Sequence, residues 1–218
     1  KELAEQTSIF ITEGDSASGT ITKARNAETQ AVFSLRGKPI NCYKESRKKV
    51  AENEELNLLI NALGLEDDIE NLRYKKIIVA TDADDDGMHI RMLVLTFFMK
   101  YYPDLIRRGH VYILQTPLFR VKNKKEVRYC YNIEEKDKAV SALKTGVEIT
   151  RFKGLGEISS NEFEDFIGEG MRLDKVKLSD EESIAEIMEF YMGDNTIDRQ
   201  NFIRQYLRSE AELEDVNI

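Results

Sequence analysis

The sequence predicts an α/β fold, in which a parallel sheet is flanked by helices and followed by a mostly helical C-terminal tail. Three short runs of apolar and β-branched residues, at 8–12, 75–81 and 110–116, are typical of buried strands. Helical patterns lie between these runs, and alternation of strands with helices favours a parallel sheet. After Pro117 the pattern changes to short strands and then helices, which indicates a part of different architecture.

The first element is the run SIFIT at 8–12, a buried strand that ends at the tight turn EGDSASG. Residues 16–27 then predict a helix, with Asp15 or Ser16 as the capping residue. A second helix is predicted over 53–63, where apolar residues recur at helical spacing until a glycine ends the pattern.

The second strand is the run KKIIVAT at 75–81, which ends directly at a cluster of acidic residues. The stretch from His89 to Gly109 is apolar with helical spacing, and Pro103 predicts that this helix breaks or restarts there. The run HVYILQT at 110–116 predicts the third strand, which completes a strand–helix–strand pattern.

The rest of the chain predicts a small β segment and several helices. The stretch EVRYCYNI predicts an edge strand, and EITRFKGLGEIS predicts a strand followed by a glycine loop. Helices are predicted at 134–144, 161–168, 180–193 and 196–209.

Composition limits the function classes. With 218 residues and a hydrophobic fraction of 41%, the chain can form a real core. A net charge of −8 argues against an indiscriminate nucleic-acid binder, although RGKPINCYKESRKK and RVKNKKEVR are locally basic. Two distant cysteines without a CxxC pair argue against a zinc ribbon and favour a reducing cytoplasm. No run is long enough to cross a membrane, and we expect a fragment because the chain has no initiator Met.

The stretch TDADDDGMHI at 81–90 places four carboxylates within five positions. Asp82, Asp84 and Asp86 alternate, and alternate residues share a face at an extended strand end. Their carboxylates would converge, and a divalent cation such as Mg²⁺ would remove the repulsion between them. A solvated acidic turn is the alternative interpretation.

Two other classes of site share parts of this pattern. An EF-hand loop would require Glu at its twelfth position, where this chain has Leu93, and a helix before the loop. A phosphatase of the haloacid dehalogenase type fits DDDG after a strand, with an Asp nucleophile and Mg²⁺. The phosphatase hypothesis stays open here, but it does not explain EGDSASG.

Glu13 follows the first strand as Asp82 follows the second. In a parallel sheet, ligands bind at the carboxyl ends of strands, so Glu13 faces the acidic cluster if the two strands are neighbours. Neighbouring carboxylates would raise the pKa of Glu13 and suit it to act as a general acid. GDSASG is neither a Walker loop nor a nucleophile elbow.

Four motifs, EGDSASG, LRGKPIN, TDADDDGMHI and RFKGLGEIS, occur in an order that resembles the B subunits of bacterial type IIA DNA topoisomerases. The resemblance covers the Toprim domain, a Rossmann-like parallel sheet flanked by helices, and the tail behind it. FSLRGKPIN and HVYILQTPLFR are more similar to the topoisomerase IV branch than to the gyrase branch. Ser34 and Ser18 depart from the usual residues, but neither departure touches the acids.

The resemblance implies a Mg²⁺-binding Toprim domain at 1–121 and a tail at 122–218. Glu13 matches the general acid and a metal ligand; Asp82, Asp84 and Asp86 match the other acidic ligands of one or two Mg²⁺ ions. Arg36, Lys38 and Lys153 match DNA-binding positions. His89 is similar to a family position just past the acids, and a capped or core histidine is an equal alternative to a direct role there. No role carries over to Asp85.

The resemblance also implies partners. An A subunit would supply the tyrosine that cuts double-stranded DNA, in an A2B2 heterotetramer that uses ATP bound elsewhere in the full-length protein. We expect this fragment to be inactive alone and to act in the cytoplasm on the nucleoid, without contact to a membrane. The phosphatase, and a Toprim primase or nuclease, remain the alternatives.

Overall fold

The computed structural model describes residues 5–66, 69–178 and 181–206. The chain divides into two compact units, Lys1–Lys177 and Leu178–Ile218. In its described part, the first unit holds two sheets and the helices around them, and the second holds two helices.

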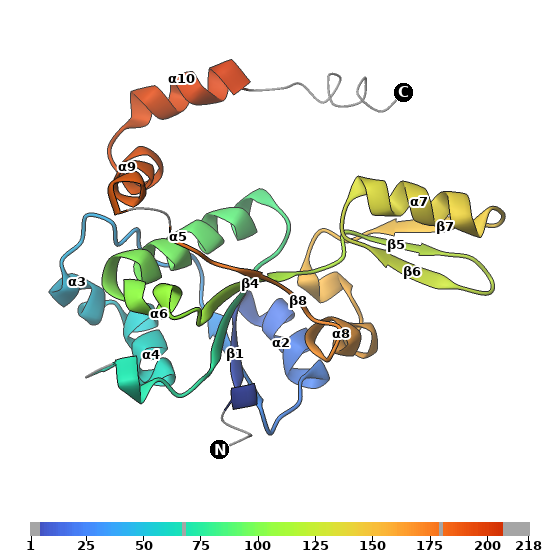
Figure 1. Cartoon of the computed structure of the whole chain (residues 1–218), viewed down its shortest axis with the longest axis horizontal. Helices are drawn as coiled ribbons and strands as arrows, with labels where there is room; N and C mark the ends of the chain where they lie inside the picture. Colours follow the sequence, from blue (N-terminus) through green and yellow to red (C-terminus); the bar gives the residue numbers. More distant parts are fainter. Residues whose placement is uncertain (1–4, 67–68, 179–180, 207–218) are drawn as a thin grey trace. The chain divides into compact units, whose positions relative to one another are not determined.

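The main sheet has five strands: β1 (Ser8–Glu13), β2 (Gln30–Leu35), β3 (Lys76–Ala80), β4 (Val111–Gln115) and β8 (Arg172–Lys175). Their order is β2-β1-β3-β4-β8 (Figure 1). The first four strands are parallel, whereas β8 runs antiparallel to β4. The α/β fold with a mostly parallel sheet is therefore confirmed, and a strand from the tail forms one edge of that sheet.

Helices cover both faces of the main sheet. They are α2 (Gly14–Ala24), α3 (Arg47–Glu52), α4 (Glu54–Leu63), α5 (Asp85–Tyr101), α6 (Pro103–Arg107) and α8 (Ser160–Ile167). In Figure 1, α2 and α8 lie on one face, and α4, α5 and α6 lie on the other. Two short 3₁₀ turns, η1 (Ile69–Asn71) and η2 (Leu155–Glu157), complete the connections of this unit.

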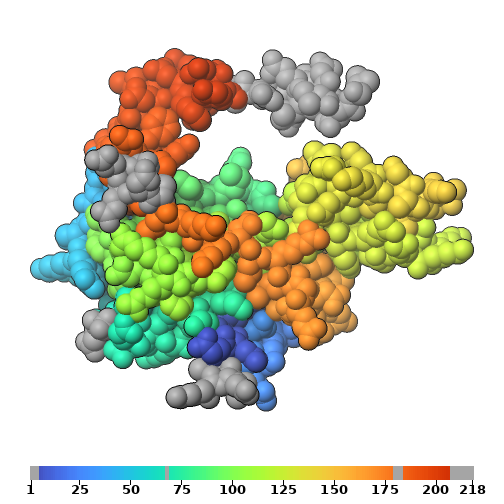
Figure 2. All heavy atoms as spheres, in the orientation of Figure 1, coloured from blue at the N-terminus to red at the C-terminus, as the bar shows by residue number. Residues whose placement is uncertain are grey.

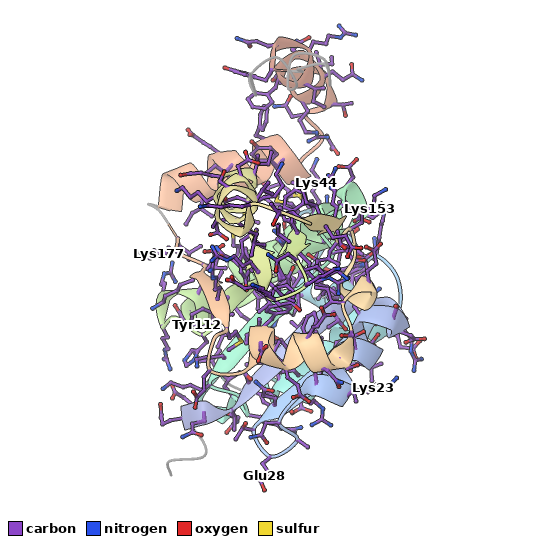
Figure 3. All side chains as sticks on the ribbon, turned by 90° about the vertical axis from the view of Figure 1, so that its right-hand side faces the viewer. Lys23, Glu28, Lys44, Tyr112, Lys153 and Lys177 are labelled. Atoms are coloured by element: carbon purple, nitrogen blue, oxygen red, sulfur yellow. The ribbon has the colours of Figure 1, made fainter. Side chains whose placement is uncertain are left out.

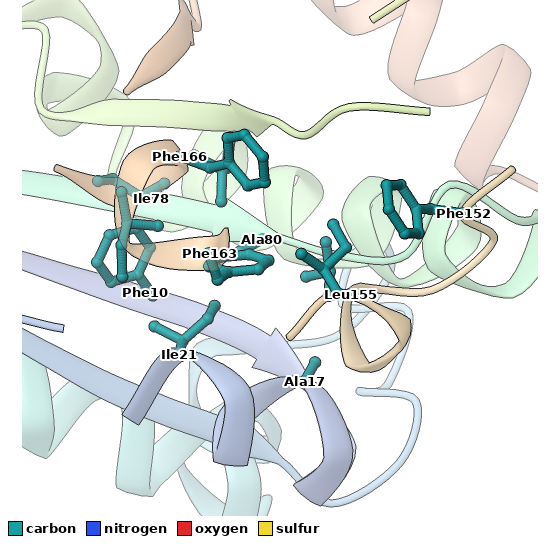
Figure 4. Close-up of a cluster of buried hydrophobic side chains, with 12 residues drawn as sticks. Phe10, Ala17, Ile21, Ile78, Ala80, Phe152, Leu155, Phe163 and Phe166 are labelled. Atoms are coloured by element: carbon teal, nitrogen blue, oxygen red, sulfur yellow. The ribbon is translucent and has the colours of Figure 1, made fainter. Parts of the chain in front are cut away.

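A cluster of buried side chains packs between the main sheet and the helices α2 and α8 (Figure 4). Phe10 and Ile78 from the strands pack with Ile21 from α2 and Phe163 from α8 (Figure 4). Leu155, from η2, belongs to the same cluster and is only 2% exposed. Burial of these side chains removes apolar surface from water, and this anchors both helices and η2 to the sheet.

A small antiparallel sheet follows the main one in the chain. It consists of β5 (Phe119–Lys122), β6 (Val127–Cys130) and β7 (Glu148–Arg151), in the order β6-β5-β7, with α7 (Ile133–Leu143) packed against it. Arg120 Nη1 and Tyr129 Oη both donate to Glu162 Oε1 of α8, at 2.7 and 2.6 Å. In Figure 2 the atoms of the small sheet and α7 meet those of α8, so this helix joins the small sheet to the main one.

The second unit is a helix pair, α9 (Glu181–Met192) and α10 (Thr196–Tyr206). The rings of Phe190 and Phe202 meet edge-on with centroids 5.6 Å apart. Arg199 Nη1 donates to the carbonyl oxygens of Phe190 and Gly193, which holds the start of α10 against the end of α9.

Most predicted elements are confirmed, with boundaries that local chemistry explains. Asn53 caps α4, and Gly64 ends it in the left-handed conformation with φ of 76°. Pro103 begins α6, because proline is tolerated at the first turn of a helix. The predicted edge strand and the helix after it are confirmed as β6 and α7, and η2 lies within the predicted glycine loop.

Three predictions were wrong or incomplete. The helix predicted over 16–27 begins earlier, at Gly14, and the residue before it caps without a side-chain hydrogen bond. The strands β2, β5 and β8 had no place in the predicted pattern, and β8 lies between two predicted helices of the mostly helical tail. The predicted helix over 196–209 is confirmed as far as Tyr206; its last residues lie outside the described part.

No helix in the described ranges combines the length and apolar character that a membrane crossing requires. The boundary expected between a Toprim domain at 1–121 and a tail at 122–218 falls inside β5. The two compact units instead divide after Lys177, so that domain boundary stays a prediction.

Candidate metal centre at the carboxyl edge of the main sheet

The two strands that precede the predicted acids are neighbours. β1 pairs with β3 in parallel, with Thr12 opposite Ala80, so Glu13 and the residues after Ala80 emerge at the same edge. On its other side β1 pairs with β2, and Glu13 lies opposite Leu35, the residue before Arg36. The parallel register thus brings the acids and the LRGK motif to one edge of the sheet.

The acidic stretch is a turn followed by a helix start. β3 ends at Ala80 and α5 begins at Asp85, so the expected alternation of three aspartates along a strand was wrong. Asp84 caps α5 by accepting a hydrogen bond from Gly87 N at 2.7 Å, and Asp86 lies in the first helical turn. A Cβ at Gly87 would lie 2.2 Å from the carbonyl oxygen of Asp82, so only glycine allows α5 to begin this close.

Asp82 is held by a segment distant in sequence. Its Oδ1 accepts a hydrogen bond from Leu155 N of η2 at 2.7 Å. Burial raises the pKa of Asp82, and the charges of Asp84 and Glu157 act in the same direction, whereas the Leu155 N–H opposes them. This carboxylate therefore sits where a further cation would favour its charged form.

Glu13 is the acid with an unsatisfied oxygen. Its Oε2 is buried and has no hydrogen-bond partner among the described residues. Burial raises the pKa of Glu13 most, followed by the charges of Asp82, Asp84 and Asp86, while Lys38 lowers it. The expected direction is confirmed, but desolvation, rather than any one neighbouring carboxylate, is the largest single cause.

Basic residues stand at the same edge. Lys38 Nζ lies 2.6 Å from Asp86 Oδ1, and this hydrogen bond raises the pKa of Lys38 and lowers that of Asp86. Lys153 is exposed, and its carbonyl oxygen accepts from Ala83 N at 3.2 Å, directly beside Asp82. Figure 3 shows Lys153 at the opposite end of the sheet from Glu28.

Arg36 and His89 complete the set of predicted positions. Arg36 is exposed directly after β2, and its backbone N–H donates to Glu55 Oε2. His89 is also exposed, which excludes the alternative of a core histidine at that position.

These carboxylates fit a magnesium ion chemically, although they are not gathered around one point. Across residues 5–66, 69–178 and 181–206, no three His, Cys, Asp or Glu side chains are close enough to hold a metal ion. Each aspartate of the set instead bonds a protein donor: Asp82 to Leu155 N, Asp84 to Gly87 N and Asp86 to Lys38 Nζ. The donors are all oxygens, and the buried Oε2 of Glu13 has no hydrogen-bond partner within the described part of the chain. Such a set suits Mg²⁺, which binds through few carboxylates.

Sequence reasoning missed the contribution of the glycine loop to the acids. The loop was singled out for Lys153 and its two glycines, but the hydrogen bond that it makes to the acids comes from the backbone N–H of Leu155. Every residue except proline carries a backbone N–H, so no residue type could have signalled this contact.

Two family models match the chain. The Toprim domain matches residues 8–116, and the carboxyl terminus of the DNA gyrase B subunit matches residues 144–204. The first covers β1, β2, β3 and β4 with Glu13, Asp82, Asp84 and Asp86, and the second covers the glycine loop, α8, α9 and most of α10.

Relatives with the same domains cover nearly the whole chain. The B subunit of DNA topoisomerase 4 from Borreliella burgdorferi is 56% identical over 94% of this chain and 34% of that protein. The B subunit of DNA gyrase from Thermus thermophilus is 41% identical over 98% of this chain and 35% of that protein. The chain thus spans about a third of the curated relatives that it matches.

A solved structure shares the fold. The DNA-binding, cleavage and re-ligation domain of Plasmodium falciparum topoisomerase II superposes with a TM-score of 0.80, at 24% identity, over 95% of this chain and 30% of that one. None of these matches supports the phosphatase or the primase alternative. The chain belongs to the Toprim family, as the Toprim segment of a type II DNA topoisomerase of the gyrase B and topoisomerase IV B group.

Proposed function

We propose that this chain is the Mg²⁺-binding Toprim segment of the B subunit of topoisomerase IV. Its identity to the topoisomerase 4 relative is higher than its identity to the gyrase relative, 56% against 41%, and this supports that branch. In the full enzyme it would take part in ATP-dependent cleavage of both DNA strands, strand passage and religation. We further propose that residues 1–121 carry the metal site and residues 122–218 form the tail.

Mg²⁺ is the metal that Toprim domains generally bind, and we assign one or two ions to Glu13, Asp82, Asp84 and Asp86. When bound, the ion would supply positive charge beside a phosphate and its leaving oxygen. The observation that carries this assignment is the buried Oε2 of Glu13, which has no protein partner among the described residues and stands beside the acidic turn.

Glu13 would serve as the general acid. Burial and the neighbouring aspartates raise its pKa, which favours the protonated form that a general acid needs, and a 3′ oxygen leaving a backbone phosphate requires such a proton. On resealing, the same carboxylate would accept the proton from that oxygen. The position of Glu13 at the end of β1, one strand away from the acidic turn, supports both roles.

Arg36, Lys38 and Lys153 would contact the DNA backbone. All three are exposed, and they follow or lie beside strand ends at the edge that carries the acids. Arg and Lys side chains supply most contacts to phosphate oxygens, so these residues would position the duplex rather than read its sequence.

The partners follow from this role. We propose double-stranded DNA and the topoisomerase A subunit, which would provide the tyrosine nucleophile within an A2B2 assembly. ATP would bind another part of the full-length protein, and the enzyme would work in the cytoplasm on the nucleoid. This chain alone would then neither cleave nor relax DNA.

The test is a cleavage assay with the chain joined to its A subunit, Mg²⁺ and supercoiled plasmid, with detection of protein covalently bound to DNA ends. Glu13→Gln and Asp84→Asn should each reduce the covalent complex at least tenfold, and Asn can still cap α5. Asp85→Asn, in the same turn, is the matched control and should retain the complex. Equal complex formation by wild type and Glu13→Gln would overturn the assignment.

A further inference from the structure

The glycine loop, defined here as Lys153–Glu157, contacts both strand ends that carry the candidate metal ligands. At the residues that follow β3, Leu155 N donates to Asp82 Oδ1 at 2.7 Å, and the carbonyl oxygen of Lys153 accepts from Ala83 N at 3.2 Å. At the residues that follow β1, Gly156 lies against Ser16 in the first turn of α2. A segment of the tail therefore spans the site from one strand end to the other.

The fold holds this loop firmly. Leu155 is buried in the cluster that contains Ala17 of α2, and the flanking Phe152 and Ile158 belong to the same cluster (Figure 4). Within the loop, Lys153 N donates to Glu157 Oε2 at 2.9 Å. An N–H on such an anchored segment is a donor with a fixed direction.

The glycines allow the backbone to come this close. A Cβ at Gly154 would lie 2.9 Å from Asp82 Oδ2, the oxygen that Leu155 leaves free. A Cβ at Gly156 would lie 2.2 Å from Ser16 Oγ. Any side chain at position 154 would therefore push on the free oxygen of Asp82 or cover it.

We propose that the glycine loop is a positioning element for the metal site, in which Leu155 N–H fixes the Asp82 carboxylate while Gly154 keeps its second oxygen open to the cation. The inference rests on the proposed function, since it concerns Asp82 as a ligand of Mg²⁺. Groups that orient metal ligands usually contribute tenfold or more to metal affinity, which makes the effect measurable.

Two substitutions at position 155 separate the N–H from the side chain. Leu155→Pro removes the donor, and the local backbone tolerates proline because Leu155 begins η2 and Gly154 is extended, with φ of −124° and ψ of 155°. Leu155→Ala keeps the donor and loses more of the buried side chain than proline does. Gly154→Ala keeps the donor and crowds Asp82 Oδ2 instead.

The experiment titrates Mg²⁺ into the full 218-residue chain by calorimetry and records the melting temperature with EDTA and with Mg²⁺. We expect Leu155→Pro and Gly154→Ala to weaken Mg²⁺ binding about tenfold or more and to lose most of the Mg²⁺-dependent rise in melting temperature. Leu155→Ala should lower the melting temperature in EDTA yet keep its Mg²⁺ affinity within about threefold.

The outcomes separate this inference from the proposed function. If the wild-type chain binds Mg²⁺ and all three variants bind it equally well, the positioning role is wrong and the metal site stands. If Leu155→Ala loses as much affinity as Leu155→Pro, packing rather than the N–H is responsible, and the role assigned to the donor fails. If the wild-type chain binds no Mg²⁺, the proposed function itself fails.

Discussion

Lys38 Nζ and Asp86 Oδ1 lie 2.6 Å apart, which links the loop after β2 to the first turn of α5. The pair joins a residue that we propose contacts DNA with a residue that we propose binds the metal. Both side chains are substantially exposed, at 47% and 68%, so the pair is weak and can exchange partners. Lys38 thus competes with any cation for Asp86.

The first prediction concerns this competition. Lys38→Met should strengthen Mg²⁺ binding by roughly threefold, because a cation is removed from the carboxylates, and should weaken DNA binding. Calorimetry with Mg²⁺ and a fluorescence assay with a DNA duplex would measure the two effects. Weaker Mg²⁺ binding in this variant would contradict the competition.

Lys100 gives a prediction about stability. Its ammonium group donates to the carbonyl oxygens of Cys42, Tyr43 and Glu45, which belong to the loop that follows LRGK. Lys100→Met would remove a charged donor from all three carbonyl oxygens, of which Cys42 O still accepts from Glu45 N and Glu45 O from Tyr101 Oη, and it should lower the free energy of unfolding by about 1–3 kcal/mol. Lys48→Met, whose side chain is 86% exposed, is the control and should change it by less than about 0.5 kcal/mol. Urea denaturation measures both, and equal values would contradict this role.

Glu162 predicts a specific pH dependence. Burial acts to raise its pKa, but hydrogen bonds from Tyr129, Ser159 and Arg120 outweigh burial and lower it to about 2. Because the pKa of Glu162 is lower in the folded state, its charged carboxylate stabilises the fold at pH values above 4.5, the pKa in the unfolded chain. This stabilisation is lost as the pH falls toward 2.

Glu162→Gln should therefore cost about 1 kcal/mol at neutral pH, and the difference from wild type should shrink between about pH 5 and pH 2. Denaturation curves across that range would show the convergence. Glu164→Gln, on the exposed side of the same helix, should stay close to wild type throughout. A constant difference for Glu162→Gln would show that the charge is not involved.

Two glycines in helices should respond oppositely to alanine. A Cβ at Gly87 would meet the backbone of Asp82, so Gly87→Ala should destabilise the fold by about 1–3 kcal/mol. A Cβ at Gly19 in α2 would meet no atom within 4 Å, so Gly19→Ala should stabilise the fold by about 0.5–1 kcal/mol. Thermal melts of both variants check the signs, and a stabilising Gly87→Ala would be inconsistent with the observed helix start.

The sequence predicts best those strands whose residues form a continuous apolar run. β1 and β3 are runs of buried apolar residues, and burial on both faces of a parallel sheet produces such runs. β4 has the same apolar sequence, VYIL, although only Val111 and Leu114 in it are fully buried. β2 and β8 lie at the two edges of the sheet and are only partly buried, so their sequences lack this signal. β8 also reads RLDK, which is polar enough to fit a helix or a loop.

The site residues were predictable, but their local geometry was not. The aspartates are recognisable because four of them occur within five positions of the sequence. Their place at the carboxyl edge of the sheet follows from the parallel pairing of β1 with β3. The spacing of Asp84 and Gly87 is compatible both with a strand end and with a capped helix start, and only packing against Asp82 selects the helix. The partner of Asp82 is a backbone N–H that lies 73 residues further along the chain, where side-chain identity gives no signal.

That separation has a consequence for synthesis. A nascent chain that has emerged through residue 116 contains every acid of the site and four of the five strands of the main sheet. It still lacks the donor to Asp82 and the edge strand beside β4, which are made only when the ribosome reaches Leu155 and then Lys175. The acidic turn therefore reaches its final arrangement only after this later segment has been made, and truncations that stop at the end of the Toprim match should leave the proposed metal site incompletely ordered.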